Sequence, residues 1–369
     1  MKILICYGTR PEVIKMASLI HSFRSAGQEV MLCDTGQHEE LLDQAKKFFE
    51  LESDYSLQLM TENQSLNRLS SRILSSFENV LDDFNPDLVF VQGDTTTAFT
   101  ISLACFHRKI DVCHVEAGLR TYDLEAPFPE EMNRQVISKL AKFHFAPTQK
   151  AFDNLINDGI QSNRIIITGN TVIDSLFWTL KKLDRGYTNP FINKWTDYIS
   201  DNKPLIIVTL HRRENLGSGI IEVCNALNKI YKSTNCQIIW PLHPNPKVYE
   251  SIKSSQLGIN SVNFVEPLDY PSFIWLLSKA SLVISDSGGI QEEAPSFGVK
   301  VLVTRESTER TEGIENNTSI IVGTNKDKIV KNTLRIIGSA EPKINTVNPY
   351  GNGNAAKKIV DFVLNFNHL

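Results

Sequence analysis

The stretch KILICYGTRPEVIKMASLIHSFRSA, residues 2–26, decides the fold of this chain. It opens with an apolar run from Lys2 to Tyr7, which is typical of a strand, and then turns at Gly-Thr-Arg-Pro-Glu. From Glu12 to Ala26, apolar side chains recur at the spacing of one helix face. The stretch therefore predicts one β-loop-α unit.

The same pattern recurs along the chain. Further strand-like runs in the first half lie at 29–33, 87–91, 111–115 and 143–146, and the helical runs that follow them lie at 39–50, 95–108, 130–141 and 148–158. Strands that alternate with helices of this length pair in parallel, because a tight turn cannot join parallel neighbours. A second series of strand-like runs lies at 204–210, 237–241, 262–265, 282–285, 299–303 and 319–322. We predict an α/β protein of two Rossmann-like domains that face each other across a cleft.

The length of the chain also favours two domains, because 369 residues exceed what one hydrophobic core usually supports. A polar stretch at about 181–202 lacks strong periodicity and lies near the expected junction. We place the N-terminal domain at 1–170 and the C-terminal domain at 171–353. The last helix, within 354–369, is a candidate to return to the N-terminal domain.

Composition excludes several classes of function. The net charge is −4 with both signs interspersed, which leaves no basic stripe for nucleic acid. The six cysteines lack CxxC spacing, and His211 and His243 have no partner at the spacing of a zinc site, so we expect reduced thiols and no metal. No apolar run approaches the ~20 residues of a membrane helix, and the N-terminus is too short for a signal-peptide core. We expect a soluble, cytoplasmic protein that binds neither nucleic acid nor membrane.

Polar residues follow nearly every predicted strand. Ligands of open parallel sheets bind at the carboxyl ends of the strands, so a site is expected in these loops. The loops lie at 8–12, 36–38, 93–97, 116–118, 211–215, 243–246 and 286–289. Taken singly, each of them also fits an ordinary turn or helix cap.

The segment SDSGGIQEEAPSFG, residues 285–298, is the most informative of these loops. Ser287, Gly288 and Gly289 open a predicted helix, and glycines there let backbone N–H groups approach a phosphate. Glu293, one turn later, could accept hydrogen bonds from ribose hydroxyls. The pattern favours a diphosphate site, while an ordinary N-cap with surface glutamates is the alternative.

Charged groups in the other loops complement that segment. Arg10 and Lys15 add positive charge on the first turn and helix, and Asp94, Glu116 and Glu130 supply carboxylates. Carboxylates aimed at a sugar ring can donate and accept protons when burial raises their pKa toward neutrality. The combination favours nucleotide-sugar chemistry, although Asp94 alone also fits a capping residue.

Ordered motifs along nearly the whole chain carry a resemblance to a known family. They are GTRPEVIKMA (8–17), TGQH (35–38), VQGDTTTAF (91–99), HVEAGLRT (114–121), PFPEEMNR (127–134), TGNTVID (168–174), VTLHRREN (208–215), HPNP (243–246), SDSGGIQEEAPSFG (285–298) and TERTEG (308–313). Through them the chain resembles the non-hydrolysing UDP-N-acetylglucosamine 2-epimerases, bacterial enzymes of the GT-B type fold. The resemblance implies a homodimer that needs no cofactor and whose product feeds surface polysaccharide synthesis, such as that of a capsule.

The reaction that this resemblance implies interconverts UDP-N-acetylglucosamine and UDP-N-acetylmannosamine. UDP is eliminated, 2-acetamidoglucal stays bound, and UDP re-adds while a proton reaches the opposite face of C2. No carbonyl lies beside C2 to stabilise a carbanion, so coupling loss of the proton to departure of UDP avoids that species. Two protic groups on opposite faces of the sugar are therefore needed.

By motif position, the resemblance also implies residue roles. The residues expected at the chemistry are Asp94, Glu116, Glu130, Arg134 and His211. Those expected to hold UDP are Arg10, Lys15, Ser287, Gly288, Gly289, Glu293 and Arg310. The positions that bind an activating second substrate molecule in some bacterial members are Gln37, His38, Gln64, Arg212 and His243.

Alternative functions stay open on the sequence. A hydrolysing epimerase, which releases N-acetylmannosamine, shares the fold, but the intact GDTTTA and HVEAGLRT segments favour the non-hydrolysing branch. A GT-B glycosyltransferase would need an acceptor, and a catalytically silent sensor would bind UDP without turnover. Asp123, Glu125 and Glu131 receive no role and are expected to be solvated loop charges.

Overall fold

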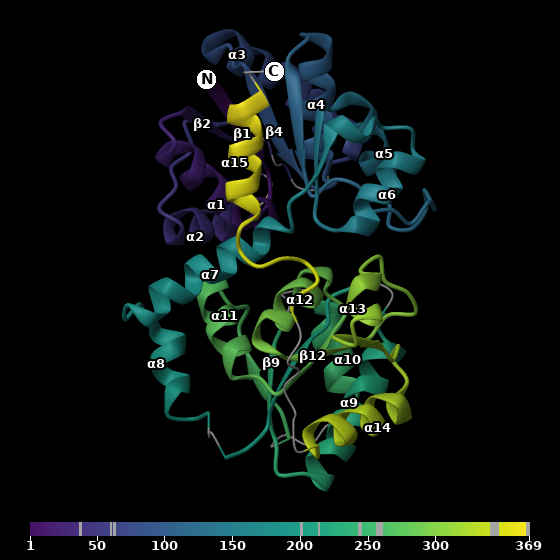
Figure 1. Ribbon diagram of the computed structural model, residues 1–369. Helices are drawn as coiled ribbons and strands as arrows, with labels where there is room; N and C mark the ends of the chain where they lie inside the picture. The colour runs from purple at the N-terminus through teal and green to yellow at the C-terminus, as the bar shows by residue number, and fades with distance from the viewer. Residues whose placement is uncertain are drawn as a thin grey trace. The chain divides into compact units, whose positions relative to one another are not determined.

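The computed structural model divides the chain into two compact units (Figure 1). The N-terminal unit is Met1–Trp178 with Tyr350–Leu369, and the C-terminal unit is Thr179–Pro349. The structure describes residues 1–36, 39–59, 61, 64–199, 202–212, 215–242, 246–255, 261–339 and 347–366.

The N-terminal unit is built on a parallel sheet, which has seven strands among the described residues, in the order β3-β2-β1-β4-β5-β6-β7. The strands are β1 (Lys2–Tyr7), β2 (Glu29–Asp34), β3 (Tyr55–Ser56), β4 (Leu88–Gln92), β5 (Asp111–Val115), β6 (Phe143–Ala146) and β7 (Ile165–Ile167). The helices are α1 (Arg10–Ser25), α2 (Glu39–Phe48), α3 (Leu66–Phe84), α4 (Thr96–His107), α5 (Glu130–Leu140), α6 (Gln149–Asn157), α7 (Thr171–Asp184) and α15 (Ala355–Phe366). The strand order reverses between β1 and β4, where open sheets of this kind bind their ligands.

The C-terminal unit repeats this architecture with a six-stranded parallel sheet in its described part, in the order β10-β9-β8-β11-β12-β13. Its strands are β8 (Leu205–Thr209), β9 (Gln237–Pro241), β10 (Asn263–Val265), β11 (Leu282–Ser285), β12 (Lys300–Val303) and β13 (Ser319–Ile321). Its helices are α8 (Pro190–Thr196), α9 (Ser218–Ser233), α10 (Pro246–Ser254), α11 (Tyr270–Lys279), α12 (Gly288–Glu293), α13 (Thr311–Glu315) and α14 (Lys326–Ile337). The predicted fold class, two Rossmann-like α/β domains with parallel sheets, is confirmed.

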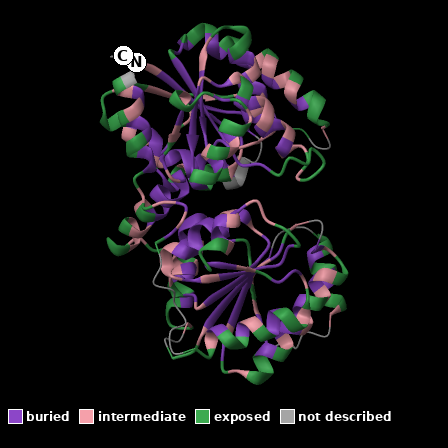
Figure 2. Ribbon diagram, turned by 45° about the vertical axis from the view of Figure 1, so that its right-hand side comes forward, coloured by how far each residue is buried: buried purple, intermediate pink, exposed green. Residues whose placement is uncertain are grey.

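Both sheets are buried on their two faces, as apolar strands between helices require (Figure 2). On one face of the first sheet, Phe90 lies 5.2 Å from Phe23 and 6.1 Å from Phe145, measured between ring centroids. Phe362 of α15 continues this row at 6.0 Å from Phe145. The C-terminal helix therefore returns to the N-terminal unit, beside α1 (Figure 1).

The junction of the units differs from the expected boundary at residue 170. The division falls at Trp178, inside α7, because the first half of this helix packs on the N-terminal unit. The hydroxyl of Ser175 donates to the carbonyl of Ile14 at 2.5 Å, and the Trp178 ring lies 5.0 Å from that of Phe49. Asp174 accepts the backbone N–H groups that open α15, which ties the returning helix to α7.

Three local features of the structure bear on predictions made from the sequence. Helix α3 (66–84) and the short strand β3 (55–56) lie in a part of the chain where no element was expected. The helix expected at 290–297 is α12 followed by a 3₁₀ turn, Ala294–Phe297, because Pro295 cannot continue the α-helical hydrogen bonds. Within the described residues all six cysteines are buried and free, and no helix is long and apolar enough to cross a membrane.

Candidate active site

Glu116 lies at the carboxyl end of β5, buried between two partners. Its backbone adopts a left-handed conformation, with φ of +62°, and its side chain is 7% exposed. Oε2 accepts a hydrogen bond from the amide of Gln92 at 2.6 Å and pairs with the ammonium of Lys15. Gln92 ends the neighbouring strand β4, and Lys15 lies on α1. Three elements therefore orient one carboxylate.

Asp94 follows β4 and is held by a cation of its own. Nε and one terminal nitrogen of Arg134 both lie 2.7 Å from Oδ2 of Asp94. The amide of Asn133 donates to the Asp94 carbonyl at 2.8 Å. Helix α5 therefore contacts this loop through both Asn133 and Arg134. Charge-assisted bonds of this kind fix orientation as well as adding energy. Two carboxylates thus stand at neighbouring strand ends, each with a fixed cationic partner.

Glu130 opens α5, where the helix dipole favours negative charge, and its side chain is half-buried. The next residue, Glu131, corrects the expectation of a solvated charge. Glu131 is fully buried and accepts the backbone N–H groups of Thr121 and Tyr122 at 3.0 and 3.1 Å. Burial alone would raise its pKa, but these hydrogen bonds and the Arg134 charge bring the pKa below its ordinary value. Glu131 is therefore the anchor of the loop that joins β5 to α5.

Asp123 and Glu125 in the same loop are exposed, as expected. Arg10 is the first residue of α1 and is partly exposed. The predicted N-terminal residues thus gather at the carboxyl ends of β1, β4 and β5.

His211 follows β8 and is oriented by Asp286, which follows the neighbouring strand β11. Nδ1 of His211 lies 2.9 Å from Oδ1 of Asp286, whose side chain is fully buried. Asp286 also accepts the backbone N–H of Arg212 at 3.0 Å and the amide of Asn215 at 2.9 Å. Burial alone would raise the pKa of Asp286, but the His211 side chain and these donors hold that pKa below its ordinary value.

The glycine pair that opens α12 lies beside Arg310. A Cβ atom added to Gly288 would stand 2.7 Å from Cζ of Arg310, so the guanidinium would have to shift to make room for it. Arg310 is held there by ion pairs with Glu292, at 3.0 Å, and with Glu309. Arg310, predicted to hold UDP, is therefore also a packing partner of the loop.

Ser287 and Glu293 complete this segment. The backbone N–H of Ser287 donates to the hydroxyl of Ser285 at 2.9 Å, which shapes the turn before α12. Glu293 is buried and accepts a hydrogen bond from the hydroxyl of Tyr270 at 2.9 Å. Glu293 is therefore buried and hydrogen-bonded, whereas a glutamate in an ordinary helix cap would lie at the surface.

The residues predicted for a second substrate molecule are described only in part. Gln37, His38 and His243 lie outside the described residues. Gln64 is partly exposed, and its side-chain oxygen accepts from the hydroxyl of Thr61 at 3.0 Å. Arg212 donates to the carbonyl of Asp286 at 3.0 Å.

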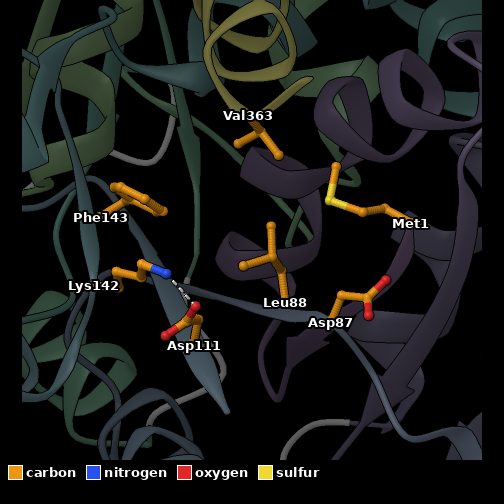
Figure 3. A pocket seen from close by; sticks show the side chains of 7 residues that line it. All are labelled: Met1, Asp87, Leu88, Asp111, Lys142, Phe143 and Val363. Carbon is orange, nitrogen blue, oxygen red and sulfur yellow. Dashed lines mark hydrogen bonds and ion pairs between the residues drawn. The ribbon is translucent and has the colours of Figure 1, made fainter. Parts of the chain in front are cut away.

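A cavity of about 280 Å³ in the N-terminal unit is lined by none of these residues (Figure 3). Its lining includes Leu88, Asp111 and Phe143, which stand at the amino ends of β4, β5 and β6, and Val363 of α15. The amino ends of the strands form the edge of the sheet opposite the candidate site. This cavity is therefore separate from the predicted chemistry.

Three polar residues of the site received no role of their own from the sequence: Glu12, Gln92 and Asp286. Glu12 was assigned to a structural turn, yet it is buried and bonded to the loop that carries Asp94, through Thr95. Gln92 and Asp286 stand at or directly after strand ends. Asp286 lies in a loop where the rule of polar groups after strand ends already placed a site, and extending that rule to the last residue of the strand would have found Gln92.

Comparison with known proteins decides the family. Residues 22–364 match the family described as UDP-N-acetylglucosamine 2-epimerase. The chain belongs to this family. The resemblance drawn from the motifs is thereby confirmed at the level of the epimerase family.

Relatives of this epimerase chain match it from end to end. The UDP-N-acetylglucosamine 2-epimerase of Campylobacter jejuni is 44% identical over 372 residues, which cover 98% of this chain and 97% of that protein. The crystal structure of UDP-GlcNAc 2-epimerase from Neisseria meningitidis bound to UDP-GlcNAc has a TM-score of 0.93 and 44% identity, covering 99% and 100% of the two chains. The S. aureus MnaA–UDP structure has a TM-score of 0.90 and 38% identity, covering 100% and 98%.

Proposed function

We propose that this epimerase family member interconverts UDP-N-acetylglucosamine and UDP-N-acetylmannosamine without hydrolysis. The observation that carries the proposal is the pair of carboxylates at neighbouring strand ends, Asp94 on Arg134 and Glu116 on Lys15. Epimerisation at C2 needs one group to take a proton and another to return one from the opposite face. Two separately held carboxylates meet that need.

The N-terminal unit supplies the proton chemistry in this proposal. Asp94, Glu116 and Glu130 handle the protons at C2, and Arg134 keeps Asp94 in place. Glu116 is buried, and Glu116 and Asp94 each have a fixed cationic partner before the substrate arrives, which lowers the cost of arranging them during the reaction. Because C2 loses its proton as UDP leaves C1, no free carbanion forms, and the bound 2-acetamidoglucal is the species to which UDP returns.

The C-terminal unit binds the leaving group in this proposal. His211 stabilises or protonates the departing phosphate, and Asp286 sets the orientation of its ring. Ser287, Gly288 and Gly289 present backbone N–H groups to the diphosphate. Glu293 accepts from the ribose hydroxyls, and Arg10, Lys15 and Arg310 add positive charge for UDP.

The proposal also covers the regulation, oligomeric state and cellular role of the enzyme. We infer that the enzyme acts as a cytoplasmic homodimer that supplies surface polysaccharide synthesis. We also infer that a second substrate molecule activates it through the positions named from the motifs, Gln37, His38, Gln64, Arg212 and His243. What supports these points is the motif match of the chain to bacterial family members. The domain assignment is likewise proposed: acid and base residues in the first unit and UDP in the second.

The test is incubation of the pure protein with UDP-N-acetylglucosamine in deuterated water. We expect deuterium at C2, a mixture with UDP-N-acetylmannosamine, and no free N-acetylmannosamine. Accumulation of free N-acetylmannosamine and UDP would identify a hydrolysing enzyme instead. Absence of C2 exchange would overturn the proposal, and turnover that depends on an added acceptor would identify a glycosyltransferase.

A further inference from the structure

Glu12 is a carboxylate that the proposed reaction leaves unused, although it lies beside the site. It is the third residue of α1 and is 1% exposed. One oxygen, Oε2, accepts the backbone N–H of Gly8 at 3.1 Å and the hydroxyl of Thr9 at 2.7 Å. The other oxygen, Oε1, accepts the hydroxyl of Thr95 at 2.8 Å. Both carboxylate oxygens therefore face donors.

Helix capping explains only half of this arrangement. A glutamate at the third position of a helix commonly bonds back to the residues that precede the helix, as Oε2 does here. A carboxylate with this role alone bonds only to residues next to the helix start and can remain exposed to solvent. Oε1 instead reaches a residue 83 positions away in the chain, at the end of the neighbouring strand β4. The bond to Thr95 therefore serves something other than the start of α1.

Thr95 extends the link into the next helix. Its hydroxyl donates to Glu12 and also accepts the backbone N–H of Ala98 at 3.0 Å, so it caps α4. Glu12 thus joins two loops, Gly8–Thr9 after β1 and Gly93–Thr95 after β4. These loops flank the point where the strand order reverses. The first leads directly into Arg10, and the second contains Asp94.

We propose that Glu12 is a positioning residue that fastens the loop carrying Arg10 to the loop carrying Asp94. The inference rests on the proposed function, in which Arg10 binds UDP and Asp94 handles a proton. Because one carboxylate bonds both loops, it sets the spacing between a phosphate ligand and a proton-transfer group. Above its pKa the carboxylate accepts from all three donors, whereas an amide has one acceptor oxygen and would turn an N–H₂ group toward a donor.

The burial of Glu12 is consistent with this role. A carboxylate out of water is unfavourable, and burial raises the pKa of Glu12 to about 7 even though hydrogen bonds from Thr9, Thr95 and the backbone act in the opposite sense. A solvent-exposed carboxylate could cap α1 without this desolvation penalty. The interior location is what lets one carboxylate reach both loops.

The test is a double-mutant cycle of Glu12→Gln and Thr95→Val, with Thr95→Ser as the matched control that keeps the hydroxyl. We expect each of the first two variants to lower kcat/KM by about 10- to 100-fold, since a shift of about 1 Å in a reacting group costs rate on that scale. The double variant should be less impaired than the product of the two single effects, because both changes break the bond between Glu12 and Thr95, while only Thr95→Val also removes the cap of α4. Thr95→Ser should keep kcat/KM within about threefold of the wild type.

Amide hydrogen exchange separates this inference from the proposed function. We expect Glu12→Gln and Thr95→Val each to speed exchange in both loops, and Thr95→Ser to speed it in neither, whatever reaction the protein catalyses. Faster exchange confined to the loop that carries the substitution, or kinetic effects that simply multiply, would overturn the inference. If Glu12→Gln does not fold, Thr95→Val still breaks the link with Glu12 intact and is judged by the same two-loop criterion.

Discussion

Nδ1 of His211 lies 2.9 Å from the buried carboxylate of Asp286, and the same carboxylate accepts the backbone N–H groups of His211 and Arg212. A carboxylate accepts hydrogen bonds and does not donate them, so the ring nitrogen that faces it carries the proton. The neutral ring then has its lone pair on Nε2. Asp286 therefore sets both the tautomer and the direction of the ring.

Replacement of Asp286 by asparagine should lower turnover by about 10²-fold or more, because the ring loses the carboxylate that fixes its tautomer and direction. Asn215→Ala is the matched control, since it removes another donor to Asp286 and leaves the His211 contact in place. Rates of C2 deuterium exchange and UDP affinity by calorimetry check the prediction. Wild-type turnover in Asp286→Asn would contradict it.

Amide substitution of the three carboxylates should separate chemistry from binding. We expect Asp94→Asn, Glu116→Gln and Glu130→Gln each to reduce kcat by about 10²–10⁴-fold and to change UDP affinity only a few-fold. Steady-state kinetics and UDP titration measure the two effects. Loss of UDP binding in any variant would assign that residue to structure rather than to proton transfer.

Substitutions of Lys15 and Glu116 should have coupled effects on the free energy of unfolding. Lys15→Met removes the cation that pairs with a buried carboxylate, and breaking such a pair typically lowers the free energy of unfolding by about 3–5 kcal/mol. Lys15→Met with Glu116→Gln should regain much of that loss, because the double variant no longer buries a charge. Urea unfolding of the four proteins tests this, and additive effects would show that the pair is not coupled.

Gly288 should be required for packing at the start of α12. Gly288→Ala places a Cβ 2.7 Å from Cζ of Arg310, so we expect a cost of about 1–3 kcal/mol and a lower Tm. Gly289→Ala is the control for stability, since its added Cβ meets no described atom within 4 Å. Thermal unfolding compares the two, and equal Tm values would mean that Arg310 yields without cost.

Glu12 should make stability depend on pH. Its pKa rises from an ordinary value of 4.5 to about 7 in the folded protein, so the folded state binds a proton that the unfolded state has released. The stabilisation is complete below pH 4.5 and is lost as the pH rises through 7. In Glu12→Gln this dependence disappears, so between pH 4.5 and 8 the wild type should lose about 3 kcal/mol relative to the variant.

Urea unfolding of both proteins across that range measures the difference. Any constant effect of the lost hydrogen bonds cancels, because only the change with pH is compared. The thiol of Cys6 on β1 also interacts electrostatically with Glu12, but its own pKa is raised well above its ordinary value by burial, so it stays neutral in this range. A difference that is flat with pH would contradict the prediction.

Much of the fold could be predicted because alternating apolar strands and amphipathic helices leave few ways to pair. Helix α3 was missed although Leu69, Ile73, Phe77 and Val80 mark a helix face and are all buried. There the signal was present in the sequence. The junction at Trp178 was different, because only packing of α7 on the N-terminal unit decides where one unit ends.

For the site, polar residues at strand ends could be predicted, but their partners could not. Lys15 and Glu116 are 101 positions apart, and Glu12 and Thr95 are 83 apart, so no local pattern links them. Glu131 shows the converse: its neighbours in sequence suggested solvent, yet it is buried under a loop that it holds by backbone hydrogen bonds.

The sequence by itself determined the fold class and the residues that follow the strands, because hydrophobic periodicity and strand-end position are local properties of the chain. Its ordered motifs also identified the epimerase family. Only the tertiary structure decided which cation holds which carboxylate, that Asp286 orients His211, and that Glu12 joins two loops. The reason is that hydrogen bonds and ion pairs act over about 3 Å in space, between residues that the parallel sheet brings together from distant parts of the chain.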